Sequence, residues 1–276
     1  MRCGVVPLPL AFEVPFPDFA PALARGRARV VIASGPSGKA ASAGVSAARI
    51  PERGRGGTSA RYAPAMSSDP RTPRYDPAPR DWVRPVTLEG WIVRLEPLSE
   101  AHVDGLAEVG LDPSLWRWTV VQPSDIDGLR AWVQAAVANL EAGSEMPFVT
   151  IDATTGKPIG STRFMSIVPE HRRLEIGWTW VGVPYQRTGA NQEAKYLQMR
   201  HAFEVLGANR VEFKTDSLNE KANPALLSIG ATYEGTFRNH MIMPGGRLRH
   251  STYYSVTREE WPDRKAKLEA RLASLR

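Results

Sequence analysis

Apolar and polar residues alternate along several stretches of the chain, and this alternation predicts β-strands. Successive side chains of a strand point to opposite faces, so a half-buried strand shows a period of two. The stretches that we interpret as strands are 90–95, 146–152, 159–168, 173–181, 209–215, 232–243 and 248–257. The last two flank Pro244-Gly245-Gly246, a turn sequence that favours a hairpin.

A second pattern, in which apolar residues recur every three to four positions, predicts helices. The expected helices are 99–109, 124 or 125 to about 140, 191–206, 219 or 220 to 230, and 258–275. Residues 115–121 are interpreted as a short strand or an aromatic-rich loop. The order of these elements predicts an α/β (α+β) domain with a mixed sheet, and about 180 residues are enough for one core.

The first 80 residues differ in composition from the remainder. They contain 12 of the 23 prolines and carry 12 Lys+Arg against 5 Asp+Glu, whereas residues 81–276 carry 23 against 24. Such a segment buries too little apolar surface to offset its ordering entropy, so we predict a disordered extension over 1–80 and a folded domain over 81–276, starting near Val86. A basic arm that binds nucleic acid is the alternative for the extension. The nearly neutral domain argues against a nucleic-acid-binding core.

Other sequence features limit the compartment and the chemistry. Cys3 is the single cysteine, so we expect neither an intramolecular disulfide nor a cysteine-based metal site. The five histidines show no metal-ligand spacing, and we predict no metal. No apolar run approaches the roughly 18 residues of a membrane span. Prolines interrupt the apolar opening segment, which argues against a signal peptide. We therefore expect a cytoplasmic protein.

The segment 186–191 joins a predicted strand to a predicted helix. Its small residues would let the backbone approach a ligand closely, and the first N–H groups of the helix would point at that ligand. Helix N-termini favour phosphate groups, and Arg187 adds a positive charge. The segment predicts a site for a phosphate-bearing cofactor.

Four features in order resemble the GCN5-related N-acetyltransferase (GNAT) superfamily, within it the RimJ/RimL-type ribosomal-protein N-acetyltransferase branch. They are the strand LEIGWTWV followed by YQRTGAN, the helix–Gly–strand–Asn run EAKYLQMRHAFEVLGANRVEFKTDSLNEKA, the pair IGA and EG at 229–231 and 234–235, and the closing HSTYYSVTREEWP. Together they cover about 170 residues. The resemblance implies the GNAT fold, with a mixed, mostly antiparallel sheet flanked by helices.

The resemblance also implies acetyl-CoA as co-substrate and a primary amine, on a protein N-terminus or a small molecule, as acceptor. Asn219 would contact the pantetheine arm or orient the thioester. The arm would lie along the third predicted strand at Trp178, Thr179, Trp180 and Val181. The pyrophosphate would rest on the loop residues Gln186, Arg187, Thr188, Gly189, Ala190 and Asn191.

Glu175 is the best candidate for the general base, which must accept a proton from the amine. Its apolar neighbours along the strand predict burial, and burial raises the pKa of a carboxyl group toward neutrality. We expect Glu175, Gly177 and Thr179 to share one strand face. The alternative is an ordinary ion pair between Glu175 and Arg163 or Arg173.

The general acid is less evident, because Ala222 stands where the branch often has serine. Solvent or one of Ser217, Tyr233 and Tyr253 could protonate the leaving thiolate. Two alternatives stay open: a non-catalytic acyl-CoA-binding or sensor protein, and an enzyme that uses another acyl-CoA. The resemblance places Trp116, Trp118 and Trp132 in the region of the acceptor site, where they could line a pocket or pack in the core. Arg247 and Arg249 flank the last predicted hairpin, where they could meet an acidic acceptor or be solvated. The C-terminal helix could mediate a homodimer.

Overall fold

One eight-stranded sheet forms the centre of the computed structural model, which describes residues 76–275. The strand order is β1-β2-β3-β4-β5-β6-β8-β7. Every neighbouring pair is antiparallel except β5 and β6, which are parallel. The strands are β1 (Leu88–Glu89), β2 (Val93–Pro97), β3 (Met146–Asp152), β4 (Pro158–Val168), β5 (Arg173–Val181), β6 (Arg210–Asp216), β7 (Thr232–Ile242) and β8 (Leu248–Thr257). The predicted mixed, mostly antiparallel sheet is thereby confirmed.

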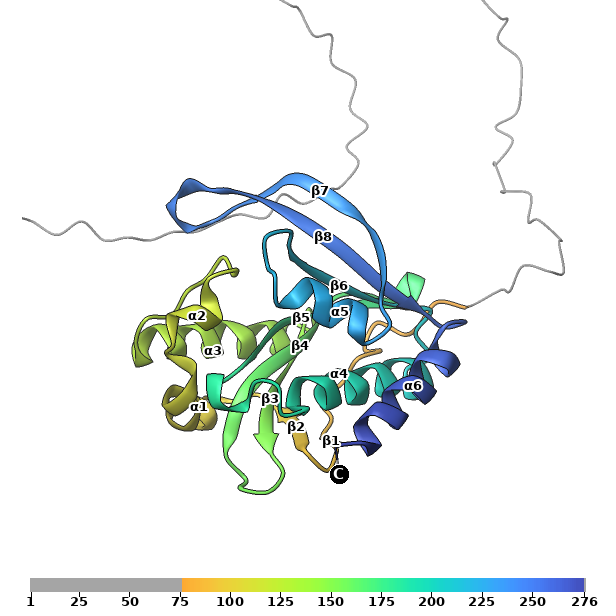
Figure 1. Ribbon diagram of the computed structural model, residues 1–276, viewed down its shortest axis with the longest axis horizontal. Helices are drawn as coiled ribbons and strands as arrows, with labels where there is room; N and C mark the ends of the chain where they lie inside the picture. Colours follow the sequence, from red (N-terminus) through yellow and green to blue (C-terminus); the bar gives the residue numbers. More distant parts are fainter. Residues whose placement is uncertain (1–75, 276) are drawn as a thin grey trace, which may run out of the picture. The chain divides into compact units, whose positions relative to one another are not determined.

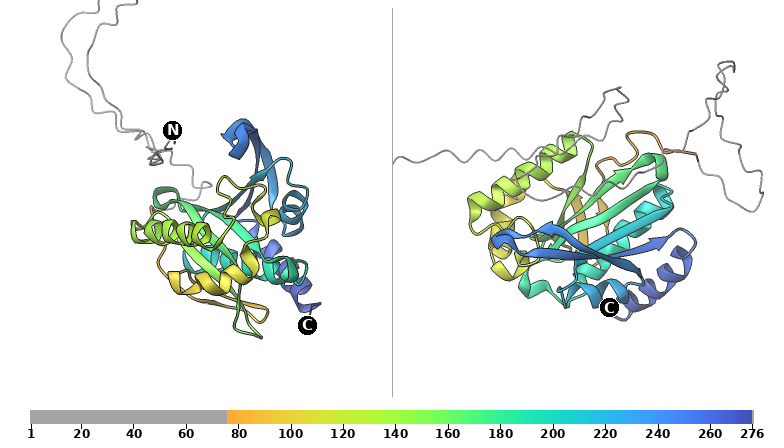
Figure 2. Two further views of the ribbon diagram at one scale, coloured as in Figure 1. Left: turned by 90° about the vertical axis from the view of Figure 1, so that its left-hand side faces the viewer. Right: turned by 90° about the horizontal axis from the view of Figure 1, so that it is seen from above.

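Helices cover both faces of this sheet (Figures 1 and 2). The helices α1 to α3 pack on one face, and α4 to α6 belong to the core on the other. Their bounds are α1 (Val103–Gly110), α2 (Pro113–Trp116), α3 (Ile126–Glu141), α4 (Ala190–Arg200), α5 (Ala222–Ser228) and α6 (Trp261–Ala273). Short turns complete the chain: η1 (Glu100–His102), η2 (Pro169–His171), η3 (Val183–Tyr185), the π-helical η4 (His201–Val205) and η5 (Pro244–Gly246). None of the described helices is long and apolar enough to cross a membrane.

Two predictions of secondary structure need correction. The 115–121 segment contains no strand: Pro113 occupies the first helical turn and Asp112 accepts the Ser114 N–H at 2.8 Å, so a short helix forms there. In the second case the helix does not start at 219 or 220. The Asn219 side-chain oxygen accepts the N–H of Ala222 at 3.0 Å, and α5 begins at that alanine.

Ordered contacts begin before the expected start at Val86. Trp82 is buried, and its indole N–H donates to the carbonyl of Leu206 at 2.8 Å. The N–H of Ala78 donates to the carbonyl of Pro169 at 3.0 Å. Contacts of the domain therefore include Ala78, which lies in the segment 1–80 that we predicted to be an extension. Residues 1–75 of the predicted extension lie outside the described residues.

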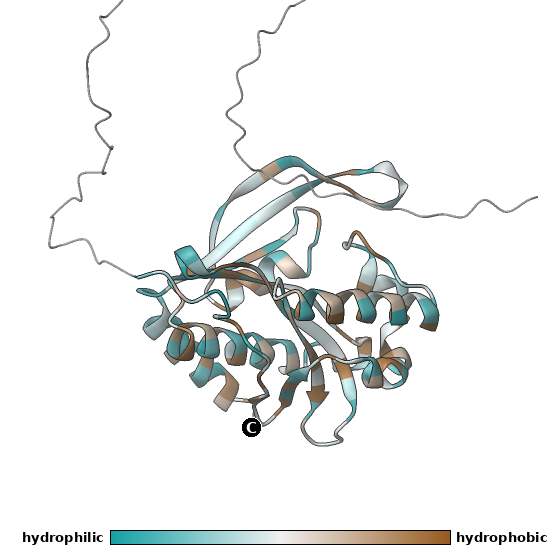
Figure 3. Ribbon diagram, turned by 180° about the vertical axis from the view of Figure 1, so that it is seen from behind, coloured by the Kyte–Doolittle hydropathy of each residue, from teal (hydrophilic) through white to brown (hydrophobic). Residues whose placement is uncertain are grey.

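Apolar side chains form one core on each face of the sheet. Figure 3 shows alternating apolar and polar bands along α3 and α6, as expected of helices with one buried side. The helix α4 is different, because eight of its eleven residues are buried. Its outer side is covered by α6, where the Trp261 ring lies against Tyr196 of α4 at 6.3 Å between centroids. As a result, α4 is held between the sheet and a second helix.

Candidate active site

The parallel strands β5 and β6 pair over a short length and then separate. Pairing joins residues 173–175 to residues 210–212, although β5 continues to Val181 and β6 to Asp216. We call the separated halves, residues 177–181 and 213–216, the splay. Backbone N–H and C=O groups on the inner edges of the splay have no partner in the opposite strand, so an extended ligand could bond to them as an added strand does.

The loop that follows β5 has an unusual backbone. Arg187 and Gly189 both have positive φ, +66° and +92°. The φ of Gly189 disfavours any side chain, and a Cβ atom there would also lie 2.7 Å from Leu275 Cδ1 and 2.9 Å from Ile92 Cδ1. Thr188 Oγ1 donates to the carbonyl of Tyr185 at 2.7 Å and fixes the loop shape.

Residues at the start of α4 fit a phosphate-bearing ligand. The N–H groups of a helix's first turn have no acceptor within the helix, and they carry its positive dipole end. Two buried polar atoms at this end, Asn191 Oδ1 and Gln192 Nε2, have no hydrogen-bond partner. Arg187 is exposed beside them. Of these two atoms, Gln192 Nε2 is a donor that a phosphate could accept from, whereas Asn191 Oδ1 is an acceptor.

A β-bulge interrupts β5 at Trp178. Arg163 pairs with Gly177 and Ser161 pairs with Trp180, so Thr162 faces two residues of β5. Trp178 itself has φ +50°. The bulge is therefore placed within the segment predicted to hold the pantetheine arm.

The bulge also reverses the side-chain alternation. Thr179 Oγ1 lies on the α4 side, where it accepts a hydrogen bond from Lys195 Nζ at 3.2 Å. Trp178 and Trp180 both approach Trp132 on the opposite side, at 6.2 and 6.3 Å between ring centroids. The prediction that Thr179 shares a face with Glu175 and Gly177 is wrong, because an extra residue intervenes.

Glu175 is buried, with 3% of its surface exposed, on the sheet face opposite α4. Its carboxylate accepts from Lys214 Nζ on β6 at 3.4 Å and from Ser166 Oγ at 3.4 Å. Burial raises the pKa of Glu175, and the nearby ammonium of Lys214 opposes that rise. This environment combines burial, which raises the pKa, with the nearby cations Lys214 and Arg249, and a perturbed carboxyl group of this kind suits a proton acceptor.

The ion-pair alternative named the wrong cations. Arg163 pairs with Glu145 at 2.8 Å, and Arg173 pairs with Glu212 at 3.2 Å. The guanidinium of Arg163 also lies over the Trp132 ring, 4.4 Å from its centroid. Lys214 is the residue that sequence reasoning missed. Alternation along β6 places Lys214 on the face opposite Phe213. Its closeness to Glu175, however, depends on which strand pairs with β6 and cannot be read from the sequence alone.

Two asparagines organise the start of α5. The Asn219 carbonyl oxygen is engaged by the helix, which leaves its amide Nδ2 as the donor available to a ligand. Asn223 donates to the carbonyls of Asp216 and Asn219 and accepts from Tyr254. Asn223 therefore joins α5, β6 and β8, whereas Ala222 presents no hydroxyl.

The three hydroxyls considered as the acid lie in different surroundings. Tyr253 is the one close enough for Glu175 to raise its pKa, after the larger effect of burial. The Tyr233 hydroxyl is exposed and bonds to Thr236. The Ser217 N–H donates to the carbonyl of His250, at the end of β6.

The β7–β8 hairpin crosses above β6 and extends over α2 (Figure 1). Arg249 on β8 is buried and donates to the carbonyl of Trp118 at 3.1 Å, which ties the hairpin to the segment after α2. Arg247 pairs with the buried carboxylate of Asp216 at 2.5 Å. Neither arginine is merely a solvated hairpin charge. Trp116 and Trp132 are core residues, whereas Trp118 is half-buried.

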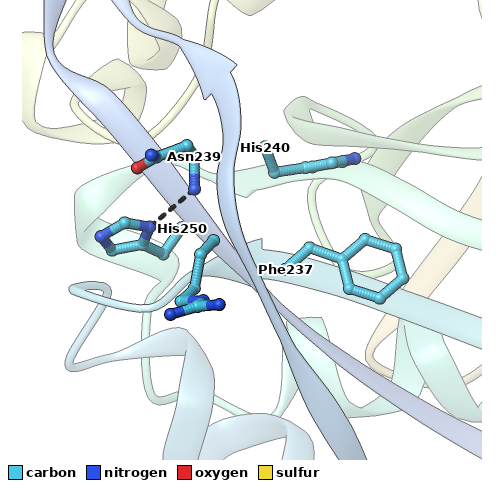
Figure 4. Close-up of a pocket in the computed structure, with 5 residues that line it drawn as sticks. Phe237, Asn239, His240 and His250 are labelled. Atoms are coloured by element: carbon cyan, nitrogen blue, oxygen red, sulfur yellow. Dashed lines mark hydrogen bonds between the residues drawn. The ribbon is translucent and has the colours of Figure 1, made fainter. Parts of the chain in front are cut away.

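Figure 4 shows an open hollow on the hairpin itself. Inside it, the N–H of Asn239 donates to His250 Nδ1 at 2.8 Å. The hollow is lined by Phe237, Arg238, Asn239, His240 and His250. It contains none of the predicted site residues. Within residues 76–275, no group of three or more histidine, cysteine or acidic side chains could hold a metal ion.

Comparisons with known proteins place the chain in a family. Residues 93–232 match the family model of the acetyltransferase (GNAT) domain. The chain belongs to this family of N-acetyltransferases, and membership implies acetyl-CoA as the acyl donor.

Individual relatives are identical to the chain at about a third of the aligned positions. The chain is 29% identical over 106 residues to "Uncharacterized N-acetyltransferase YoaA" and 31% identical over 96 residues to "Putative ribosomal N-acetyltransferase YdaF", both from Bacillus subtilis (strain 168). These matches span 38% and 34% of this chain, and only 59% and 51% of the relatives. A GCN5-related N-acetyltransferase from Brucella melitensis has a similar structure, with a TM-score of 0.65 and 31% identity, covering 71% of this chain and 88% of that one.

Proposed function

We propose that this protein transfers an acetyl group from acetyl-CoA to a primary amine on a protein N-terminus or a small molecule. The observation that carries the proposal is the splay. Its β5 strand contacts α4 through Thr179 and Lys195, and Glu175 lies buried on the other face of the same strand. Donor and acceptor could thus approach one strand from opposite sides.

Residues of the splay and the loop would hold the donor. The N–H groups from Arg187 to Asn191 would bind the pyrophosphate, because they lie at a helix N-terminus, whose first N–H groups have no acceptor within the helix. The inner backbone edge at 178–181 would bond the pantetheine arm, and Asn219 Nδ2 would donate to it. When bound, the donor supplies an activated acyl group.

Glu175 would accept the proton that the amine loses. Burial disfavours its charged form, so its affinity for a proton is higher than that of an exposed carboxylate. Lys214 stabilises the charged form that must be present before the reaction. Burial and Lys214 thus act on the pKa of Glu175 in opposite directions, and burial has the larger effect.

The acceptor class is supported by the named relatives. Similarity to a protein named as a ribosomal N-acetyltransferase favours a protein N-terminus, although the match spans half of that relative. The hairpin that borders the Glu175 face has exposed residues along most of β7, so this side is accessible to a chain end. Small amines form the other arm of the test.

A decisive experiment compares the full chain with Glu175→Gln and Gly189→Glu. Calorimetric titration of acetyl-CoA should give binding to the parent and to Glu175→Gln, and a large loss for Gly189→Glu, which strains the loop backbone and adds a carboxylate that would repel the phosphates. A screen of N-terminal peptides and small amines should give turnover by the parent and a loss of about 10²- to 10⁴-fold for Glu175→Gln. Glu108→Gln, an exposed change, is the matched control. No binding by a folded parent would overturn the proposal.

The second candidate is a non-catalytic acyl-CoA sensor. The observation that favours it is Ala222, which removes the hydroxyl expected at the start of α5. A sensor would bind acetyl-CoA with micromolar affinity, about −8 kcal/mol, and acetylate no amine in the screen.

A further inference from the structure

Lys195 is a buried lysine whose ammonium lies in the splay. It projects from the second turn of α4, and 7% of its surface is exposed. Its Nζ donates to Thr179 Oγ1 of β5 at 3.2 Å and lies 5.5 Å from the centroid of the Phe213 ring of β6. The charged group therefore sits between the two strands where they no longer pair.

The other buried polar side chains of α4 have structural tasks. Glu193 accepts the N–H groups of residues 91–93, and Gln198 accepts the hydroxyl proton of Thr162 at 3.1 Å. Lys195 has no described partner of opposite charge. A buried cation without a counter-ion costs free energy, and an apolar side chain would fill the same space without that cost. The arrangement indicates a task other than folding.

Charged groups on the neighbouring strands point away from Lys195. Glu175, Glu212 and Lys214 lie on the opposite face of the sheet, and α4 itself presents Glu193 to the β1–β2 turn. Burial is accordingly the cause that lowers the pKa of Lys195, to about 8. An ammonium of this acidity can release a proton near neutral pH.

The residue of β5 that Lys195 contacts, Thr179, indicates which part of the ligand Lys195 would meet. Phosphate donors occupy 186–191, beyond the end of β5, whereas Thr179 directly follows the bulge residue Trp178. Glu175 lies just before the bulge. If Glu175 serves the acceptor amine, the reacting carbon must lie near the bulge, and Lys195 Nζ contacts Thr179, the residue that follows Trp178.

We propose that Lys195 is a further catalytic residue, which donates a proton to the departing thiolate. This inference rests on the proposed function. The amine nitrogen bonds to the carbonyl carbon, the carbon–sulfur bond breaks, and its electron pair stays on sulfur. Lys195 gives the proton that converts this sulfur to a thiol, Glu175 takes the proton lost by the amine, and solvent restores both groups. Lys195 thereby supplies the acid that Ala222 cannot.

The first part of the test uses CoA itself and requires no turnover. The full chain is saturated with CoA, and the thiol is titrated by its thiolate absorbance in the ultraviolet. We expect the thiol of bound CoA to titrate at a lower pH than that of free CoA, because an adjacent ammonium stabilises the thiolate. Lys195→Met should abolish this shift, and the exposed Lys267→Met should leave it unchanged. Lys195→Arg should keep the shift but lose about 10²- to 10⁴-fold in turnover, because a guanidinium does not release its proton.

The outcomes separate this inference from the proposed function. If the parent fails to bind CoA, the proposed function fails. If the parent binds CoA and its thiol titrates as in free CoA, the Lys195 inference alone fails. Thr179→Val provides a second variant should Lys195→Met not fold: it removes the hydroxyl that holds Nζ, and the thiol shift should shrink while CoA binding persists.

Discussion

Glu193, in the first turn of α4, accepts the backbone N–H of Val93 at 2.7 Å, although the two residues are 100 positions apart in the chain. The same carboxylate accepts the N–H of Ile92 at 2.7 Å and that of Trp91 at 3.2 Å. These three hydrogen bonds restrain the N-terminus of α4, which the proposed function assigns to the pyrophosphate. The turn that begins β2 is therefore bound to the start of α4.

Glu193→Ala should lower the free energy of unfolding by about 3 kcal/mol, because it leaves buried N–H groups without an acceptor. Chemical denaturation of the full chain measures this change. Glu108→Ala, which removes an exposed carboxylate from a surface ion pair, should change stability by less than about 1 kcal/mol. Equal effects of the two substitutions would show that Glu193 does not anchor α4.

Lys214→Met should move the acid limb of the activity profile to higher pH. The ammonium of Lys214 lowers the pKa of Glu175, so its removal lets burial raise that pKa further. A base must be ionised to act, and the variant should lose more activity at pH 6 than at pH 8. Arg173→Met, which removes a cation paired with Glu212 instead, should leave the limb in place. A limb that stays fixed in both variants would exclude Glu175 as the titrating base.

Gly177→Ala should reduce turnover more than stability. The added Cβ would lie 2.5 Å from Met165 Sδ and 3.1 Å from Glu175 Oε1. The flexible thioether can move aside, but the carboxylate is then displaced from its position. Steady-state kinetics beside thermal unfolding would measure both effects. Adding Met165→Ala provides room, and the double variant should recover part of the lost activity.

Lys195→Met should raise the free energy of unfolding at pH 7 by up to about 3 kcal/mol, the equivalent of the pKa depression from 10.5 to about 8. Between these two pH values the unfolded chain binds more protons at this residue than the folded chain does. Parent stability therefore rises with pH, and the advantage of the variant should fade toward pH 10.5. Urea denaturation at pH 7 and pH 10 measures the difference. A variant that is less stable at pH 7 would indicate a structural role.

Much of the fold could be predicted because strand alternation is a local property. The β5 strand, the loop with Gly189 and the hairpin turn at Pro244 are all encoded within a few residues. The short helix α2 was missed because two tryptophans at a spacing of two imitate a strand, while the capping signal of Asp112 and Pro113 lies just upstream.

The contents of the site were harder to predict, because they depend on which strands become neighbours. The partner of Glu175 follows from the parallel pairing of β5 with β6, which brings Lys214 within reach from 39 residues away. The place of Thr179 depends on a bulge that alternation alone conceals. Lys195 gave no signal, because a lysine in a predicted amphipathic helix is assigned to the solvent side.

The contrast between α4 and β7 has an evolutionary consequence. Eight of the eleven residues of α4 are buried, whereas nine of the eleven residues of β7 are exposed. Substitutions in α4 disturb its packing against both the sheet and α6, but most substitutions along β7 change only the surface that a binding partner would contact. Proteins with this architecture can therefore change their binding partners through substitutions in the hairpin, while packing restricts which substitutions α4 tolerates.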